Sequence, residues 1–141
     1  MKKEKVKSLI EKAENIGLKG VLMLEAWGVD EICLEYNGIG PAFLPSKLRE
    51  KVTKLLGIFE PAAMIHDLRF GRSDGSRLKF DQANDEFFLN CRECAKAAYG
   101  WWNWRRYRAY AVAGLMHEFN CGNPGWKAWM DAYENNKHKE R

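Results

Sequence analysis

The chain has 141 residues, of which 46% are hydrophobic and 30% are charged. This balance excludes a disordered protein and fits one domain with its own core. The net charge of +4 favours anionic surfaces such as phospholipid or nucleic acid. No apolar run is long enough to span a bilayer, and no apolar segment follows the basic residues 1–7 as a secretory signal requires. We therefore expect no transmembrane segment and a cytoplasmic chain as encoded.

The first third of the chain contains one clear helix and two short ambiguous segments. Apolar residues at helical spacing predict an amphipathic helix over 3–16, ended by Gly17. Residues 21–24 are apolar and fit either a strand or a buried helix. Alternating residues over 31–36 predict a short strand that leads into a Gly- and Pro-rich loop over 37–41.

The middle of the chain predicts two helices separated by glycine. Ser46 is placed to cap a helix that runs to Leu56, with Gly57 as its end. Pro61 suits the first turn of a second helix, because a proline there lacks only an N–H that would have no partner. A turn over 73–76 ends this second helix.

The last part of the chain predicts three more helices. A long helix covers 80–99, with Asp81 as N-cap, and Gly100 separates it from a helix over 101–119 rich in Trp and Arg. A short helix with Trp126 and Trp129 follows a turn, and the tail 134–141 is expected to fray. The sequence therefore predicts a mainly α single domain over 1–141, with two long packed helices and little β structure.

Three segments carry residues suited to chemistry, and the first is the loop at 36–40. Glycines at alternate positions let the backbone adopt positive φ and turn its carbonyls inward. A ring of carbonyls with one carboxylate suits calcium, which takes oxygen ligands in flexible geometry. An ordinary turn is the alternative.

The second segment is the pair His66 and Asp67 on the helix over 59–70. Adjacent helical residues point about 100° apart, so each side chain needs its own partner. The imidazole suits general-base catalysis near neutral pH, and the carboxylate suits metal binding. The alternative is a histidine with structural hydrogen bonds beside an exposed aspartate.

The third segment places Asp81 and Asp85 one helical turn apart. Phe80 and Phe87 belong to the apolar side of the same helix, so a carboxylate here could hold the second nitrogen of a histidine. Capping by Asp81 and solvation of Asp85 are the structural alternative.

Together the three segments resemble the phospholipase A2 superfamily. The ordered trio is Tyr-x-Gly-x-Gly, His-Asp-x-x-aromatic and an Asp on the next long helix, and residues 84–88 are similar to the family's Ala-Asp-x-x-Phe segment. The disulfide-poor members are most alike, including those of parvovirus capsids, bacteria and phages. The resemblance covers about 33–95 and leaves out the Trp-rich helices over 101–133.

The resemblance implies a calcium-dependent hydrolase that cleaves the sn-2 ester of glycerophospholipids at a membrane surface, with virion association or release also compatible. The implied calcium ligands are the backbone carbonyls of Tyr36, Gly38 and Gly40 and the carboxylate of Asp67.

The implied general base is His66, which would activate a water. Asp85 would hold its far nitrogen, with Asp81 as the second choice. Phe70 departs from the family, which usually has tyrosine there, and this departure bears on activity rather than fold. A non-catalytic binding or structural module of phage or mobile-element origin on the same scaffold is the alternative function.

Four further residues have the spacing of zinc ligands. They are Cys91, Cys94, His117 and Cys121. Because Cys91 and Cys94 fall in the middle of a helix beside apolar residues, core thiols or a disulfide are the preferred interpretation.

The helix over 101–119 begins with a cluster of tryptophans and arginines suited to a membrane interface or to nucleic acid. The candidate interface residues are Trp101, Trp102, Trp104, Arg105 and Arg106. The preferred interpretation is that Trp101, Trp104, Tyr107 and Arg108 repeat every three or four residues, so that one face of the helix is core and the arginines are solvated.

Overall fold

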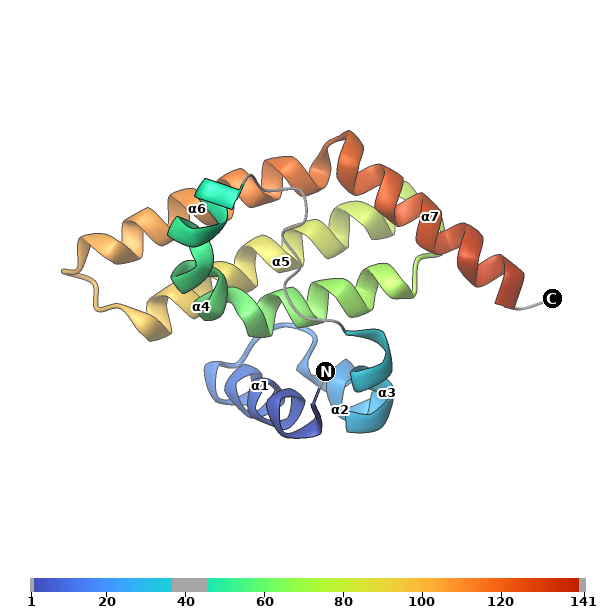
Figure 1. The fold of residues 1–141 in the computed structure, drawn as a ribbon, viewed down its shortest axis with the longest axis horizontal. Coiled ribbons are helices and arrows are strands. Elements are labelled where there is room, and N and C mark those ends of the chain that lie inside the picture. Colours follow the sequence, from blue (N-terminus) through green and yellow to red (C-terminus); the bar gives the residue numbers. More distant parts are fainter. Residues whose placement is uncertain (1, 37–45, 140–141) are drawn as a thin grey trace.

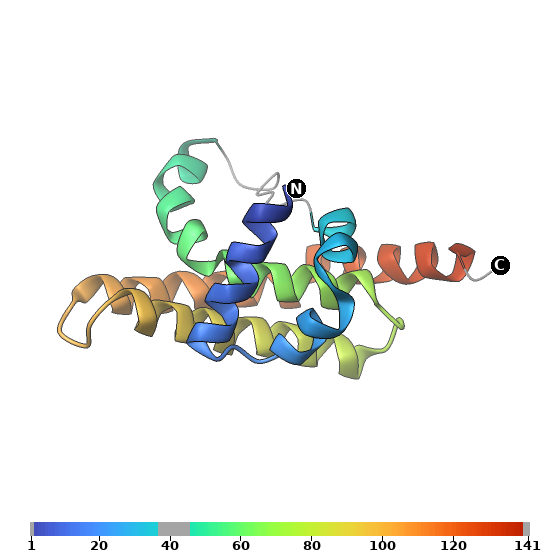
Figure 2. The ribbon, with the colours of Figure 1, turned by 90° about the horizontal axis from the view of Figure 1, so that it is seen from below.

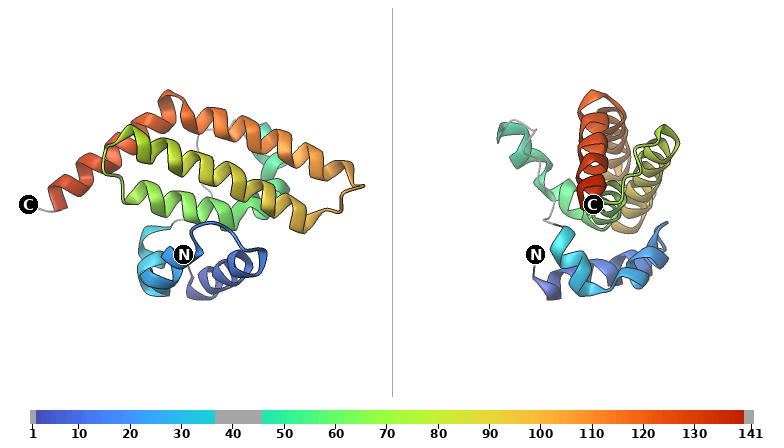
Figure 3. Two further views of the ribbon diagram at one scale, coloured as in Figure 1. Left: turned by 180° about the vertical axis from the view of Figure 1, so that it is seen from behind. Right: turned by 90° about the vertical axis from the view of Figure 1, so that its right-hand side faces the viewer.

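The computed structural model describes residues 2–36 and 46–139, the side chains of 46–55 excepted, and these parts form seven helices and no strand. The mainly α class is therefore confirmed. The helices are α1 (Lys3–Ile16), α2 (Val21–Trp27), α3 (Val29–Glu35), α4 (Ser46–Gly71), α5 (Arg77–Ala98), α6 (Trp104–Cys121) and α7 (Asn123–Lys139). Helices α4, α5 and α6 lie side by side, and α1 to α3 cover one side of them (Figures 1 and 3).

The N-terminal layer contains helix where a strand was predicted. Helix α1 ends as expected at Gly17, whose φ of 79° is left-handed. The prediction of a strand over 31–36 is wrong, because these residues end α3. Ile32 and Tyr36 are fully buried and lie four residues apart, whereas Leu34 between them is 84% exposed. The buried positions therefore follow the helical period, which six alternating residues could not distinguish from a strand.

Helix α4 joins the two helices predicted over 46–70. The prediction that Gly57 ends one helix and Pro61 begins another is wrong, because Pro61 lies inside one continuous helix. Pro61 has no N–H to donate to the carbonyl of Gly57 one turn earlier. The helix bends in this region, and its first half projects away from the bundle (Figure 2).

The connection between α4 and α5 is shorter than predicted, because α5 begins at Arg77 and not at Phe80. Ser76 Oγ accepts from Lys79 N at 3.2 Å, so Ser76 rather than Asp81 is the N-cap. Asp81 instead pairs with Arg77 at 3.3 Å, one turn earlier on the same helix. Gly75 in this turn has a φ of 78° and lies against the ring of Tyr133, where any Cβ would clash.

Helices α6 and α7 differ from prediction at their ends. Helix α6 begins at Trp104 rather than at the predicted Trp101, and Asn103 caps it by accepting from Arg105 N at 3.0 Å. The predicted frayed tail is helical to Lys139. The reason is an anchor at its end: Asn136 Nδ2 donates to the carbonyls of Gly71 and Ser73 at 2.9 and 3.3 Å.

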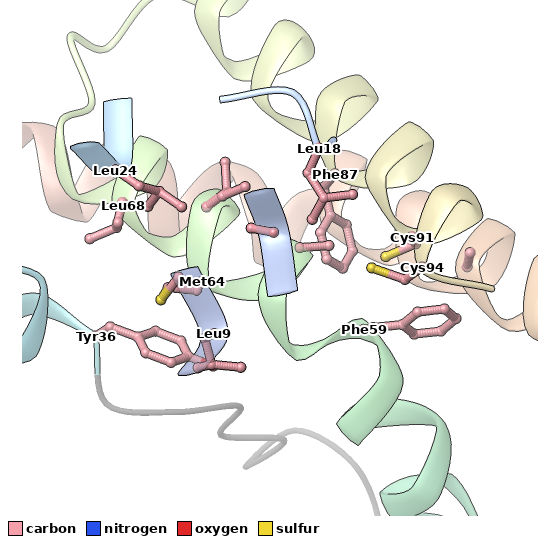
Figure 4. Close-up of a cluster of buried hydrophobic side chains, with 14 of the residues drawn as sticks. Leu9, Leu18, Leu24, Tyr36, Phe59, Met64, Leu68, Phe87, Cys91 and Cys94 are labelled. Atoms are coloured by element: carbon pink, nitrogen blue, oxygen red, sulfur yellow. The ribbon is translucent and has the colours of Figure 1, made fainter. Parts of the chain in front are cut away.

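The core lies between the N-terminal layer and the long helices. Helix α4 contributes its fully buried face, including Phe59, Met64 and Leu68, and α5 adds Phe87 (Figure 4). A second cluster joins Phe80 to Trp129 of α7. None of the described helices is long and apolar enough to cross a membrane.

Candidate functional site

His66 lies between α4 and α5, at the place where the two core clusters meet. Its side chain is 8% exposed, and its ring packs between Phe70 and Phe87, with centroids 4.4 and 4.7 Å away. Phe70, which stands where the resemblance expects tyrosine, also contacts Phe80 and Trp129. Two aromatic rings, one from each helix, therefore pack against the histidine.

Asn84 of α5 is the hydrogen-bond partner of the ring. His66 Nε2 lies 2.8 Å from Asn84 Oδ1, and Asn84 Nδ2 donates to the carbonyl of Asn120 at 3.2 Å. The bond to Asn120 fixes the orientation of the amide, so the oxygen faces the ring and Nε2 carries the proton. This tautomer leaves a lone pair on Nδ1, the nitrogen that a general base needs.

Burial lowers the pKa of His66 to about 4, with the bond to Asn84 opposing the shift. The ring is therefore neutral at pH 7 and can accept a proton. A neutral amide, however, supplies no negative charge to stabilise the protonated ring.

Asp67 lies on the Nδ1 side of the histidine. The distance from His66 Nδ1 to Asp67 Oδ1 is 3.9 Å, and 48% of the Asp67 side chain is exposed. Surrounding protein raises the pKa of this carboxyl to about 7 by desolvation. Because nearly half of the side chain remains in contact with water, we expect only part of this shift in solution.

Tyr36, the residue that follows α3, lies within electrostatic range of this carboxylate. Tyr36 is fully buried, its hydroxyl donates to Glu60 Oε1 at 3.5 Å, and Lys5 pairs with the same oxygen at 3.1 Å. Burial first, and then the charges of Glu60 and Asp67, raise the pKa of Tyr36. The charge of Asp67 thus acts on the phenol of Tyr36, whereas the ligand predicted for calcium is the backbone carbonyl of this residue. Gly38 and Gly40, the other two residues predicted for that site, lie outside the described residues.

The predicted role of Asp85 as the partner of His66 is wrong. Asp85 is 67% exposed, and its Oδ1 lies 2.9 Å from Nε2 of another histidine, His117. Asp81, the second choice, pairs with Arg77.

The residue that sequence reasoning missed is Asn84, and a signal for it exists. Phe80, Asn84, Phe87 and Cys91 recur at helical spacing, and all four are buried. Asn84 therefore lies on the apolar stripe of α5, whereas Asp85 points about 100° away from it.

The four candidate zinc ligands do not form one cluster. Cys91 and Cys94 are buried in the core near Phe59 and Phe87 (Figure 4), and burial raises the pKa of Cys94 to about 11. Cys121 Sγ lies 3.5 Å from His117 Nε2 at another place on the bundle. Among the side chains that the structure describes, no group of three or more His, Cys, Asp or Glu residues could hold a metal ion.

The prediction that one face of the Trp- and Arg-rich segment is core is wrong. Trp101, Trp104 and Tyr107 are 71%, 61% and 54% exposed, and Trp102 is 76% exposed. Arg105 and Arg108 are exposed as well, whereas the buried residues of α6 are Ala109 and Ala113.

Two cavities open among the described residues, and His66 lines neither of them. One of about 480 Å³ lies beside Gly71, one turn after Asp67, and is lined by Glu35, Arg72, Tyr133 and Lys137 among others. Another, of about 570 Å³, lies between α2 and the start of α5, beside Trp27, Arg69 and Glu86.

The chain matches no protein-family model, and comparison with curated proteins and with solved structures finds no match either.

Proposed function

We propose that the protein is a calcium-dependent hydrolase of glycerophospholipid esters, similar in mechanism to the phospholipase A2 superfamily, with His66 as its base. The observation that supports this proposal best is the 2.8 Å bond from His66 Nε2 to Asn84, which leaves Nδ1 free on the side of Asp67. In this arrangement Nδ1 would take the proton from a water as that water attacks the ester carbonyl.

Calcium fits the chemistry of Asp67. Among the described residues, no lysine or arginine pairs with this carboxylate, and its raised pKa reflects desolvation without a compensating cation. The backbone carbonyl of Tyr36, with those of Gly38 and Gly40 as the resemblance implies, would complete an oxygen-rich set. When bound, calcium would polarise the ester carbonyl and stabilise the oxyanion.

The proposal is tested by fatty-acid release from mixed phosphatidylcholine and phosphatidylglycerol vesicles, with calcium or with EGTA. We expect release with calcium, none with EGTA, and a loss of at least 100-fold in His66→Gln. Release that is equal in EGTA, or wild-type rates in His66→Gln, would exclude the mechanism. Folding of His66→Gln is checked by its helical circular dichroism.

One observation favours the alternative, a non-catalytic module on the same scaffold. The position that would hold the orienting acid carries the neutral side chain of Asn84, and the ring is nearly buried. If calorimetry detects no calcium binding and no vesicle composition is hydrolysed, the non-catalytic module replaces the hydrolase as the proposed function.

A further inference from the structure

The start of α6 forms an exposed aromatic tip made of Trp101, Trp102, Trp104 and Tyr107, each more than half exposed. This tip lies at the end of the α5–α6 hairpin, far from the N-terminal helices and from the end of α7 (Figure 1). Large apolar groups gathered at one end of a molecule mark an interaction surface more often than scattered ones do.

The tip is held in a fixed conformation by its own hydrogen bonds. Tyr107 O–H donates to the carbonyl of Trp101 at 2.7 Å, and the rings of Trp101 and Trp102 meet edge to face at 6.1 Å. Asn103 caps α6 in the middle of the cluster. The aromatic side chains are therefore presented in place before any partner binds.

The tip is also strongly basic. Residues 101–108 contain Arg105, Arg106 and Arg108 and no acidic residue. The guanidinium groups of Arg105 and Arg108 lie 5.9 and 5.7 Å from the centre of the Trp104 ring. A partner that satisfies both features must combine negative charge with an apolar interior.

Apolar exposure continues along α6 beyond the arginines. Trp104, Ala111 and Leu115 lie on one side of the helix at spacings of seven and four residues, and Leu115 is 67% exposed. The distance from Trp104 to Leu115 is about 17 Å at the helical rise. Nucleic acid would use the aromatic and basic tip but would gain nothing from an aliphatic extension of this length.

We infer that α6 and its tip dock on the surface of an anionic phospholipid bilayer. Indole rings favour the interface between headgroups and acyl chains, and arginines beside them meet anionic headgroups. A helix that lies in the interface with an apolar side and basic flanks has this pattern of residues. The surface is separate from His66, so docking does not require hydrolysis.

The test is sedimentation of the full chain with vesicles in EGTA, comparing phosphatidylcholine alone with a mixture containing one-third phosphatidylglycerol. We expect binding to the mixed vesicles only, weakened by added salt. Trp102→Ser with Trp104→Ser should reduce binding at least tenfold. Arg105→Gln with Arg108→Gln should also reduce it at least tenfold, because each basic residue near such a surface contributes about fivefold.

Matched controls come from other exposed residues. Leu115→Ser is compared with Leu34→Ser of α3, which is 84% exposed, and the arginine pair with Lys7→Gln and Lys12→Gln of α1. His66→Gln should bind vesicles as the wild type does. Vesicle binding therefore tests docking even if no hydrolysis is detected.

Several outcomes would overturn docking on lipid. They are equal binding to neutral and anionic vesicles, no binding to either, and equal losses in the control variants. Tighter binding to a single-stranded oligonucleotide in an anisotropy assay would assign the tip to nucleic acid instead. A dimer in sedimentation velocity that dissociates in Trp102→Ser with Trp104→Ser would assign it to a second copy of the chain.

Discussion

His66 and Asn84 lie 2.8 Å apart, ring nitrogen to amide oxygen, across the contact between α4 and α5. The amide oxygen fixes the tautomer of the ring but adds no charge beside it. A carboxylate at residue 84 would keep the contact with the ring and would stabilise its protonated form. In the present structure burial disfavours that protonated form.

We therefore predict that Asn84→Asp raises the pKa of His66 by about 1 to 3 units, the usual effect of an opposite charge at this distance. The measurement is an NMR titration of the His66 ring proton. If His66 is the base of a hydrolase, release of fatty acid should rise about tenfold or more at pH 7. An unchanged pKa would show that residue 84 does not control the ring.

The same variant loses the bond that Asn84 Nδ2 donates to the carbonyl of Asn120. The cost to stability should be about 1 to 3 kcal/mol, measured by urea unfolding. Asn84→Ala serves as the comparison, because it removes both bonds and should leave the pKa of His66 low.

The variant Asp85→Asn distinguishes the partner of His66 expected from the sequence, Asp85, from the partner in the structure, Asn84. Asp85 contacts His117 and not His66, and it is mostly exposed. We expect hydrolysis and the titration of His66 to stay within about twofold of wild type, since surface substitutions away from a site have small effects. A 100-fold loss of hydrolysis in this variant would restore the original assignment and contradict the Asn84 contact.

The error at Asp85 shows what the sequence could and could not specify. The His-Asp pair, its helix and its contact with the next long helix followed from periodicity and the resemblance. The identity of the facing residue depended on a helical rotation of about 100°, which one acidic residue in a short motif does not determine. Counting the buried positions Phe80, Phe87 and Cys91 would have selected Asn84.

The other differences have tertiary causes. Six alternating residues ending at Tyr36 fit two periods equally well, and burial of Tyr36 against α4 selected the helix. Pro61 bends α4 without ending it, because its neighbours Phe59 and Met64 remain packed in the core. Asn136 orders the end of α7 through a contact with a turn 63 residues or more away, which no local pattern indicates.

The pH dependence of stability should reveal the opposed titrations of His66 and Asp67. Between pH 6.5 and about 4 the unfolded chain protonates at histidine while folded His66 stays neutral, so stability falls as pH falls. Burial raises the pKa of folded Asp67 towards 7, so between pH 7 and 3.8 the folded chain holds a proton that the unfolded chain has lost. The contribution of Asp67 to the free energy of unfolding therefore grows as the pH falls. The two slopes oppose one another in the wild type.

Asp67→Asn should therefore expose the slope of His66. We expect this variant to lose on the order of 3 kcal/mol between pH 7 and pH 4, and to lose more than the wild type does. Urea unfolding in EGTA at half-unit pH steps measures it. In the double variant His66→Gln with Asp67→Asn, the free energy of unfolding should depend less steeply on pH than in Asp67→Asn alone. Equal slopes in the two variants would show that a group other than His66 causes the pH dependence.

Asn90 provides the last prediction, which concerns the attachment of the N-terminal layer to α5. Its side chain is 1% exposed, accepts from Lys19 N at 2.9 Å and donates to Lys19 O at 2.9 Å. This pair of bonds satisfies the backbone N–H and carbonyl of Lys19, in the connection between α1 and α2. Asn90→Ala would leave the N–H and the carbonyl of Lys19 without partners, so we expect the free energy of unfolding in urea to fall by about 2 to 4 kcal/mol.

The matched control is Asn135→Ala, at an exposed position of α7, with an expected change within about 0.5 kcal/mol. Equal stability of the two variants would show that the N-terminal layer does not depend on this bond.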